Sequence, residues 1–287
     1  LDVAKICNAR CVMCPVWKNP GGLMKEELFE KIAWEMKKYN NWINTVCLSR
    51  DGEPLIDKNL HKKIKLLKDY GIKKVTLSTN ASLLDEKTAT NLIEAGLDDI
   101  MFSIDGATKE TFEAIRQGLN FEQVVENVLN FIKIRGNKEK PTIRIRMVLQ
   151  EKNRKEEKDF KKFWTGKVEK QDTIYAKEMH NWGNQLDNYE GKENEIEKYS
   201  QIPCISLWST MIIHFDGKIP LCGSDFDNKY VLGDVSKQTI KEIWASEKFN
   251  QLRKLHAEGK RNEISLCPAC NIWDLGVKKI YKLSFEK

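Results

Sequence analysis

Seven of the eight cysteines fall into two groups whose spacing suits metal or cluster sites. The first group reads Cys7-x3-Cys11-x2-Cys14, so three thiols can face one centre from a single loop. Three cysteines cannot pair evenly into disulfides, and structural zinc usually takes four Cys or His ligands, whereas His61 is the first of only four histidines. Iron–sulfur clusters are held by thiolates. The loop therefore favours an iron–sulfur site with one open position, with adventitious zinc or plain structural cysteines as the alternatives.

The second group supplies four thiols from the C-terminal part of the chain. It reads Cys204-x12-Gly217-x4-Cys222, followed after 44 residues by Cys267-Pro-Ala-Cys270. A site filled by four protein ligands is closed, and it suits a structural or electron-transfer centre. Zinc held by four cysteines is the competing interpretation.

The first group resembles the signature of the radical S-adenosylmethionine (SAM) superfamily. This resemblance implies that Cys7, Cys11 and Cys14 are catalytic and hold a [4Fe-4S] cluster, whose unique iron is chelated by the amino and carboxylate groups of SAM. It also implies that the reduced cluster cleaves SAM to methionine and a 5′-deoxyadenosyl radical, which removes a hydrogen atom from the substrate. The expected electron source is a reductant such as flavodoxin or ferredoxin.

The second group resembles the SPASM/twitch extension that carries auxiliary [4Fe-4S] clusters. A full SPASM domain continues with two further cysteines, whereas no cysteine follows Cys270 here. The resemblance therefore implies one auxiliary cluster, held by Cys204, Cys222, Cys267 and Cys270 in a shortened, twitch-type domain. The spacing is similar to that of the radical SAM dehydrogenase that acts on an aminocyclitol in butirosin biosynthesis. The expected cofactors are SAM and two [4Fe-4S] clusters.

A turn that follows the second predicted strand carries the sequence Ser49-Arg50-Asp51-Gly52-Glu53-Pro54. Taken alone it is a tight turn, and glycine allows a close approach of the backbone to a neighbour. Its position one unit after the cysteine loop resembles the glycine-glutamate motif of the superfamily. That match implies that Gly52 and Glu53 hydrogen-bond the methionine amino group of SAM. Asp51 stands where the family often has a second glycine.

Further strand ends resemble the SAM-binding segments of the family. The resemblance places Ser78 and Asn80 near SAM, Ser103 and Arg116 on its ribose and carboxylate, and Met13 against its adenine. Other interpretations remain open from the residues alone: Arg116 as a surface arginine and Met13 as a core residue. For Asp105, capping of a following helix is the favoured interpretation.

Strand-like and helix-like segments alternate over the first 180 residues, which predicts parallel strands with crossover helices. The periodicity allows either an open doubly wound sheet or a partial barrel, and the strand-end motifs favour a partial (β/α)6 TIM-like barrel over residues 1–182. The segment before Cys7 is expected to be its first strand. The remaining strands and helices are expected at Asn44–Leu48, Lys74–Ser78, Asp99–Ser103, Thr142–Leu149 and Thr173–Ala176, and at Lys25–Tyr39, Leu60–Tyr70, Asp85–Ala95, Phe121–Ile134 and Lys155–Trp164.

The second part of the chain, residues 183–287, is expected to form a polar linker and a small α+β twitch/SPASM domain. Asp216-Gly217 separates Leu207–Phe215 from Lys218–Leu221, which predicts a β-hairpin. One helix is expected over Ile240–Gly259, because apolar residues recur along it at helical spacing.

Composition excludes several classes of protein. The 287 residues carry a net charge of +6 that is spread along the chain, and no apolar run approaches the roughly 18 residues of a membrane span. No nucleic-acid-binding signature is present. Eight cysteines without a recognisable secretory signal predict a cytoplasmic location.

We therefore expect an oxidoreductase that removes two electrons from a sugar, a cyclitol or a similar small molecule, with the auxiliary cluster as electron acceptor. The net positive charge is compatible with an anionic substrate. The alternatives are an epimerase, a maturase of ribosomally made peptides and, in another class, a non-catalytic structural metal-binding protein. Cys47 is interpreted as a buried inert thiol or, less simply, as a hydrogen-atom donor. Arg144 and Arg146 are candidates for binding SAM or an anionic substrate; the roles of His180 and Trp182 are open.

Overall fold

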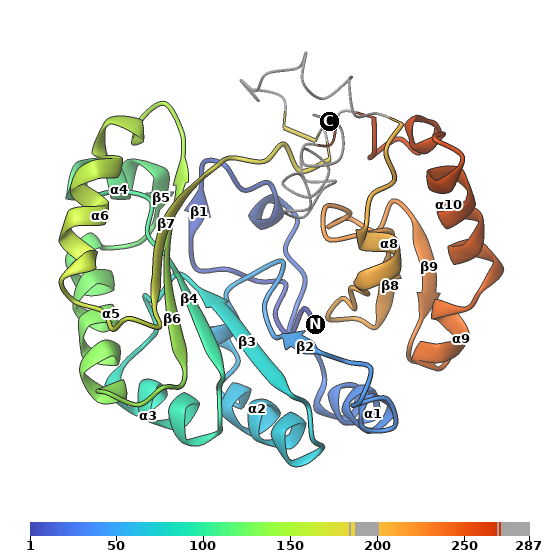
Figure 1. Ribbon diagram of the computed structural model, residues 1–287, viewed down its shortest axis with the longest axis horizontal. Helices are drawn as coiled ribbons and strands as arrows, with labels where there is room; N and C mark the ends of the chain where they lie inside the picture. The colour runs from blue at the N-terminus through green and yellow to red at the C-terminus, as the bar shows by residue number, and fades with distance from the viewer. Residues whose placement is uncertain (184, 187–200, 269, 271–287) are drawn as a thin grey trace, which may run out of the picture. The chain divides into compact units, whose positions relative to one another are not determined.

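The computed structural model describes residues 1–183, 185–186, 201–268 and 270. The chain divides into two compact units, residues 1–179 with 214–216 and residues 180–213 with 217–287 (Figure 1). Most of the predicted linker, residues 183–202, lies outside the described residues. Among the described residues, no helix is both long and apolar enough to cross a membrane.

The first unit contains a parallel β-sheet with helices between its strands, which confirms the predicted α/β class. Its five strands run in the order β2-β3-β4-β6-β7. Their bounds are β2 (Thr45–Cys47), β3 (Lys74–Thr79), β4 (Asp99–Ser103), β6 (Thr142–Leu149) and β7 (Thr173–Glu178). Each strand pairs in parallel with its neighbours in this order, so their carboxyl ends meet at one edge.

The strand expected before Cys7 does not join this sheet. In the described structure that segment forms only an isolated antiparallel bridge between Ala4 and Leu23. The amide of Lys5 donates to the Gly22 carbonyl, and the amide of Met24 donates to the Val3 carbonyl. The first residues thus pair with the segment that follows the cysteine loop, and the prediction of six sheet strands was wrong by one.

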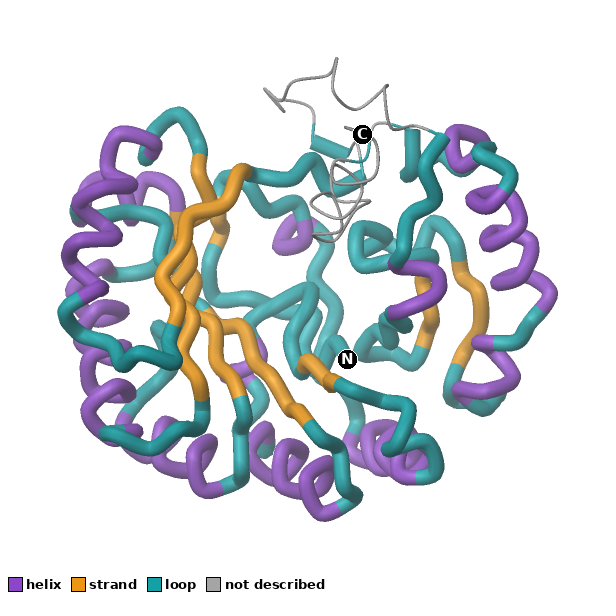
Figure 2. Tube along the Cα trace, in the orientation of Figure 1, coloured by secondary structure: helices purple, strands orange, loops and turns teal. Residues whose placement is uncertain are grey.

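The helices of the first unit lie along one face of the sheet (Figure 2). They are α1 (Glu26–Lys37), α2 (Leu60–Asp69), α3 (Glu86–Glu94), α4 (Lys109–Ile115), α5 (Phe121–Arg135) and α6 (Glu157–Thr165). The sequence prediction missed α4, which has only seven residues. Two short strands, β1 (Arg10–Cys11) and β5 (Arg116–Gln117), pair antiparallel beside the sheet.

The two faces of the sheet differ in polarity because side chains alternate along each strand. Phe102 of β4 packs edge-on against Phe131 of α5, with ring centroids 5.3 Å apart, and its register partner Ile145 is fully buried. Arg144 and Arg146 alternate with buried apolar residues of β6 and are partly exposed. The helix-facing side is therefore the apolar core, and the opposite side is polar.

The second unit has a short antiparallel ribbon that differs from the predicted hairpin. Strand β8 (Lys218–Pro220) pairs with β9 (Val231–Asp234), and Leu207 lies in the short helix α8 (Ser206–Ser209). Residues 214–216 belong to the first unit. The hairpin predicted around Asp216-Gly217 was therefore wrong, because β8 pairs with the later strand β9 and not with the segment before the turn.

The helix predicted over Ile240–Gly259 is two helices, α9 (Ile240–Trp244) and α10 (Glu247–Ala257). Ser246 interrupts them, because its side chain accepts a hydrogen bond from the Phe249 amide and so caps α10. Apolar periodicity continues through the break, which is why spacing alone did not reveal it.

A buried ion pair joins the end of α5 to the approach to β7. The guanidinium of Arg135 contacts both carboxylate oxygens of Asp172, and neither side chain is exposed. Asp172 also accepts from the Ile143 amide at 2.8 Å. We expect Asp172→Ala to lower the free energy of unfolding by about 3–5 kcal/mol, because the arginine charge stays buried without its partner.

Urea unfolding followed by circular dichroism measures this loss. Asp69→Ala is the matched control, since Asp69 pairs with Lys65 in an exposed pair and should cost less than about 1 kcal/mol. Equal losses of unfolding free energy in the two variants would contradict the buried Arg135–Asp172 ion pair.

Candidate functional site

The first cysteine group forms a folded loop at the start of the first unit. The Cys14 amide donates to the Cys11 carbonyl at 3.1 Å, and Cys11 lies on β1 opposite Arg116 of β5. The Ala9 amide donates to Cys7 Sγ at 3.4 Å. These backbone contacts turn the loop back on itself and bring its thiols near one another.

The electrostatics of the loop suit a cationic centre. Burial raises the pKa of Cys7 to about 12 and that of Cys14 to about 11, and the charge of Cys11 adds to both shifts. Burial also raises the pKa of the Cys11 thiol. Neighbouring thiolates repel each other, whereas bound iron reverses this preference and holds all three deprotonated. The donor set therefore fits an iron–sulfur cluster.

Arg116 lies next to this loop. Its Nη1 is 3.7 Å from Cys11 Sγ, and its Nε donates to Asp105 Oδ2 at 2.8 Å. Burial opposes the charged form, but Asp105 and Cys11 raise the pKa of the Arg116 guanidinium. The surface interpretation of Arg116 was wrong. So was the capping role of Asp105, because Thr108 caps α4 and Asp105 neutralises the arginine.

Gly52 packs against the first residues of the chain. A Cβ atom there would lie 2.1 Å from the Ala4 carbonyl oxygen and 2.4 Å from that of Ile6. The Glu53 amide donates to the Ile6 carbonyl at 2.8 Å. The close approach that requires glycine is therefore made by the chain's own backbone.

Glu53 joins the turn after β2 to the end of β3. Its Oε1 accepts from Thr79 Oγ1 at 2.6 Å and from the Leu55 amide at 3.1 Å, and its Oε2 accepts from the Asn80 amide at 2.8 Å. Burial raises the pKa of this carboxyl. A carboxylate offers about four acceptor positions, so Oε2 retains capacity for one more donor.

A side-chain network links the end of β3 to the cysteine loop. Asn80 Nδ2 donates to Asn8 Oδ1 at 3.0 Å, and Asn8 Nδ2 donates to Ser82 Oγ at 2.7 Å. Asn8 directly follows Cys7, so this network holds the loop. The sequence prediction missed Asn8, which belongs to the variable positions of the cysteine motif.

The other predicted SAM contacts lie on or near the same polar side. The Ser78 amide donates to Ser49 Oγ at 2.8 Å. Ser103 Oγ accepts from Arg146 Nη2 at 3.1 Å. Met13 lies within the cysteine loop and is partly exposed. Gly52, Glu53, Asn80 and Arg116 are thus connected to the loop by hydrogen bonds, by backbone packing or by the β1–β5 pairing. Ser78 and Ser103 share the polar face of the sheet.

The second cysteine group is gathered within the second unit. Burial raises the pKa of the Cys267 thiol, and the charges of Cys222, Cys270 and Cys204 raise it further, so the four thiols lie within Coulombic range of one another. The Cys270 amide donates to the Cys267 carbonyl at 3.4 Å. Four thiols suit a closed centre. In the part of the chain that the structure describes, no group of three or more His, Cys, Asp or Glu side chains forms a site for a single metal ion.

Two residues that the sequence prediction missed surround this group. His256 accepts from the Cys204 amide through Nδ1 at 3.1 Å, and burial lowers the pKa of His256 to about 4. Burial also lowers the pKa of Arg261, against the charges of nearby thiolates. His256 lies in a segment whose pattern predicts only an amphipathic helix, and Arg261 follows that segment, so no sequence signal marked either residue.

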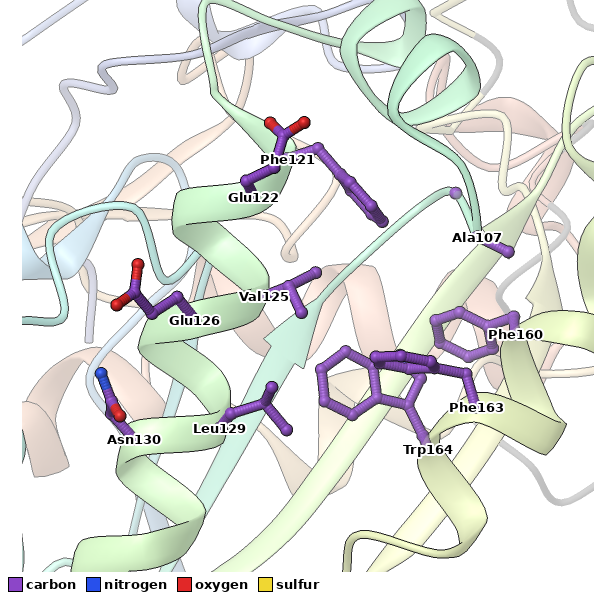
Figure 3. A pocket seen from close by; sticks show the side chains of 11 residues that line it. Ala107, Phe121, Glu122, Val125, Glu126, Leu129, Asn130, Phe160, Phe163 and Trp164 are labelled. Carbon is purple, nitrogen blue, oxygen red and sulfur yellow. The ribbon is translucent and has the colours of Figure 1, made fainter.

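A groove of about 430 Å³ lies in the helical layer of the first unit, apart from these sites (Figure 3). It is lined mainly by facing side chains of α5 and α6, including Val125, Leu129, Phe160 and Trp164. Its helical walls lie on the apolar side of the sheet. None of the predicted site residues lines it.

Comparison with known families assigns both parts of the chain. The radical SAM superfamily matches residues 1–163, and an iron–sulfur cluster-binding domain of the SPASM type matches residues 204–271. The chain belongs to the radical SAM superfamily. It is a radical SAM enzyme, whose cofactors are SAM and a [4Fe-4S] cluster, and the SPASM region implies an auxiliary cluster. The predicted family and cofactors are confirmed.

Similar sequences include two kinds of enzyme. An S-adenosyl-L-methionine-dependent 2-deoxy-scyllo-inosamine dehydrogenase of Niallia circulans is 22% identical over 275 residues, covering 94% of this chain and 91% of the relative. A probable GTP 3′,8-cyclase of Methanococcus maripaludis is 31% identical over 137 residues, covering 47% of this chain and 45% of the relative. The dehydrogenase match spans nearly the whole chain, whereas the cyclase match spans about half of it.

Solved structures share the fold. BtrN in complex with AdoMet and 2-DOIA has a TM-score of 0.66 at 20% identity, covering 94% of this chain and 90% of that one. Streptococcus suis SuiB bound to precursor peptide SuiA has a TM-score of 0.72 at 13% identity, covering 96% and 71%. The same fold therefore occurs in structures with a small molecule and with a peptide.

The packing at Gly52 gives a direct prediction. Gly52→Ala should lower the free energy of unfolding by about 3 kcal/mol, because the new methyl group overlaps two backbone oxygens that cannot rotate away. Gly166→Ala is the control, since a Cβ there meets nothing within 4 Å. Urea unfolding measures both variants; equal stability of Gly52→Ala and the unsubstituted protein would exclude the close packing.

Proposed function

We propose that this enzyme is a radical SAM dehydrogenase that oxidises an alcohol of a sugar, a cyclitol or a similar small molecule. The observation that carries the proposal is the near full-length match to an inosamine dehydrogenase. The four-thiol group of the second unit supports it. Loss of a hydrogen atom from carbon, then of an electron and the hydroxyl proton, leaves a ketone. When bound, SAM and the first cluster supply hydrogen-atom abstraction, and the auxiliary cluster supplies an acceptor for the electron.

The residues of the first site have defined parts in this proposal. Cys7, Cys11 and Cys14 hold the SAM-binding cluster, and the loop is fixed by the network that includes Asn8 and Asn80. The free acceptor capacity of Glu53 Oε2 suits the methionine amino group of SAM. The three hydrogen bonds that the Glu53 carboxylate accepts within the protein hold Oε2 in place. Glu53 can therefore bind the amino group of SAM and fix its position. The remaining proposed SAM contacts are Met13, Gly52, Ser78, Asn80, Ser103 and Arg116.

The polar face of the sheet supports a polar or anionic substrate. Arg144 is occupied by Asp99, to which its Nε donates at 2.8 Å. Arg146 donates through Nη2 to Ser103, and among the described residues its Nε has no hydrogen-bond partner. Burial lowers the pKa of this guanidinium. A hydroxyl-rich or anionic ligand would satisfy Arg146, so we assign substrate binding to Arg146 and not to Arg144.

Epimerisation is the second candidate, because of Cys47. The interpretation of Cys47 as buried was wrong: the residue is exposed and shares the polar face with Thr76, its register partner. An exposed thiol on this face could return a hydrogen atom to a substrate radical. Peptide modification rests on the fold alone, since the peptide-bound structures are below 25% identity.

The test separates these functions through single variants. After anaerobic reconstitution the protein should contain about eight irons and eight sulfides, as two cubane clusters require. Incubation with SAM, dithionite and 2-deoxy-scyllo-inosamine or a panel of sugars is followed by quantifying 5′-deoxyadenosine and oxidised product. Cys11→Ala should form no 5′-deoxyadenosine, whereas Cys270→Ala should still form it but lose the oxidised product.

Cys47→Ala is the control, and it should oxidise substrate as the unsubstituted enzyme does. If the unsubstituted enzyme forms a stereoisomer of the substrate and Cys47→Ala loses turnover, the enzyme is an epimerase and not a dehydrogenase. A full yield of oxidised product from Cys270→Ala would show that the second site has no redox role in the reaction. Two zinc ions and no iron in the reconstituted protein would contradict the whole proposal.

A further inference from the structure

Two basic side chains are buried beside the four-thiol group of the second unit. His256 lies in the last turn of α10, and Arg261 begins the short 3-10 helix that follows. Each is only 1% exposed. Arginine is almost never fully buried unless its charge is compensated. Both therefore lie where they can act electrostatically on whatever the thiols hold.

The hydrogen bonds of His256 determine where its ring proton lies. Nδ1 accepts from the Cys204 amide at 3.1 Å, so this nitrogen carries a lone pair. The proton of the neutral ring must then be on Nε2, which is 3.7 Å from Cys267 Sγ. His256 thus donates an N–H group to one ligand sulfur while it holds the backbone of a second ligand. The Trp208 ring lies edge-on to the imidazole, with centroids 6.4 Å apart.

Arg261 brings a positive charge to the same group. The charges of Cys270, Cys267 and Cys204 all act on its guanidinium. The guanidinium, which is buried, is therefore within Coulombic range of three of the four thiols. In a buried site with low dielectric constant such charges interact more strongly than in water.

We propose that His256 and Arg261 raise the reduction potential of the auxiliary cluster and so make it an electron acceptor; this rests on the proposed function. Reduction adds one negative charge to the cluster and its thiolates. An N–H donor to sulfur and a nearby cation both stabilise the reduced form, and hydrogen bonds to the sulfurs are a known determinant of potential. The electron comes from the substrate radical, whose hydroxyl proton passes to water as the ketone forms.

At the first site the charge of the neighbouring arginine is neutralised. There the arginine beside a ligand sulfur, Arg116, is bound to the buried carboxylate of Asp105 through Nε at 2.8 Å and Nη2 at 2.7 Å. The pair is close to neutral, so it adds little positive potential. A cluster that must give an electron to SAM needs a low potential, whereas an acceptor needs a higher one. The neutralised Arg116 suits the first of these tasks.

The experiment measures the potential of the auxiliary cluster alone. All variants are made in the full chain with Cys7, Cys11 and Cys14 changed to Ala, so that any cluster signal comes from the second unit. Potentiometric titration followed by electron paramagnetic resonance (EPR) gives the midpoint. We expect Arg261→Met and His256→Phe each to shift it to more negative values, and Arg261→Lys to stay near the parent.

Arg253→Met is the matched control from the same helix as His256. Arg253 donates to the Leu207 and Trp244 carbonyls, and burial alone shifts its pKa, with no thiolate contribution. Its removal should leave the midpoint unchanged. An unchanged midpoint in Arg261→Met and His256→Phe, or an equal shift in Arg253→Met, would overturn the proposal.

A measurement on the parent protein avoids dependence on variant folding. Pulsed EPR of the reduced auxiliary cluster, with 15N-labelled histidine, should show a weakly coupled histidine nitrogen and an exchangeable proton. Absence of both couplings would exclude the His256 hydrogen bond to sulfur. If the parent binds no iron–sulfur cluster at all, the proposed function itself fails, which is a distinguishable result.

Discussion

The structure depends on the gathering of thiols that repel one another when ionised. Three come from one loop of the first unit and four from three separate segments of the second. Burial and mutual charge raise the pKa of Cys7 and of Cys267, so neither group is stable as bare thiolates. Bound iron reverses this balance and turns an unfavourable arrangement into a favourable one. Cluster binding and folding of these segments are therefore coupled.

The remainder of the first unit holds the three-thiol loop against the carboxyl ends of the strands. The parallel sheet brings the turns after β2, β3 and β4 to one edge, as in α/β enzymes generally. Glu53 ties two of these turns together, Asn80 reaches the loop through Asn8, and Arg116 approaches Cys11 from β5. Each contact uses a different element. A displacement of any one strand end would therefore move the loop.

Short motifs and strongly periodic segments were predictable from the sequence. β4 and β6 occur at the predicted residues, because their apolar residues and strand lengths leave little choice. The cysteine spacings indicated the family for the same reason: ligand chemistry restricts residue type and interval. The gathering of the four C-terminal thiols could be expected from their types, although the elements that carry them could not.

Features set by competition between segments were not predictable. The first residues pair with residues 21–24 instead of the sheet, and β8 pairs with β9 instead of the preceding segment. Asp105 was mistaken for a cap because its partner, Arg116, lies eleven residues away and across a helix. His256 and Arg261 carry no motif, since their importance comes only from proximity to thiols in space. Long-range pairing decides such cases, and a single sequence records it weakly.

The central claim is that the Cys7, Cys11 and Cys14 loop leaves one iron of its cluster open to SAM. The most direct test is EPR of the anaerobically reconstituted and reduced protein, with Cys204, Cys222, Cys267 and Cys270 changed to Ala so that only the first cluster contributes. Addition of SAM should change the spectrum of this cluster, and 5′-deoxyadenosine should form. An iron-containing protein whose spectrum does not respond to SAM, and which leaves SAM intact, would contradict the account.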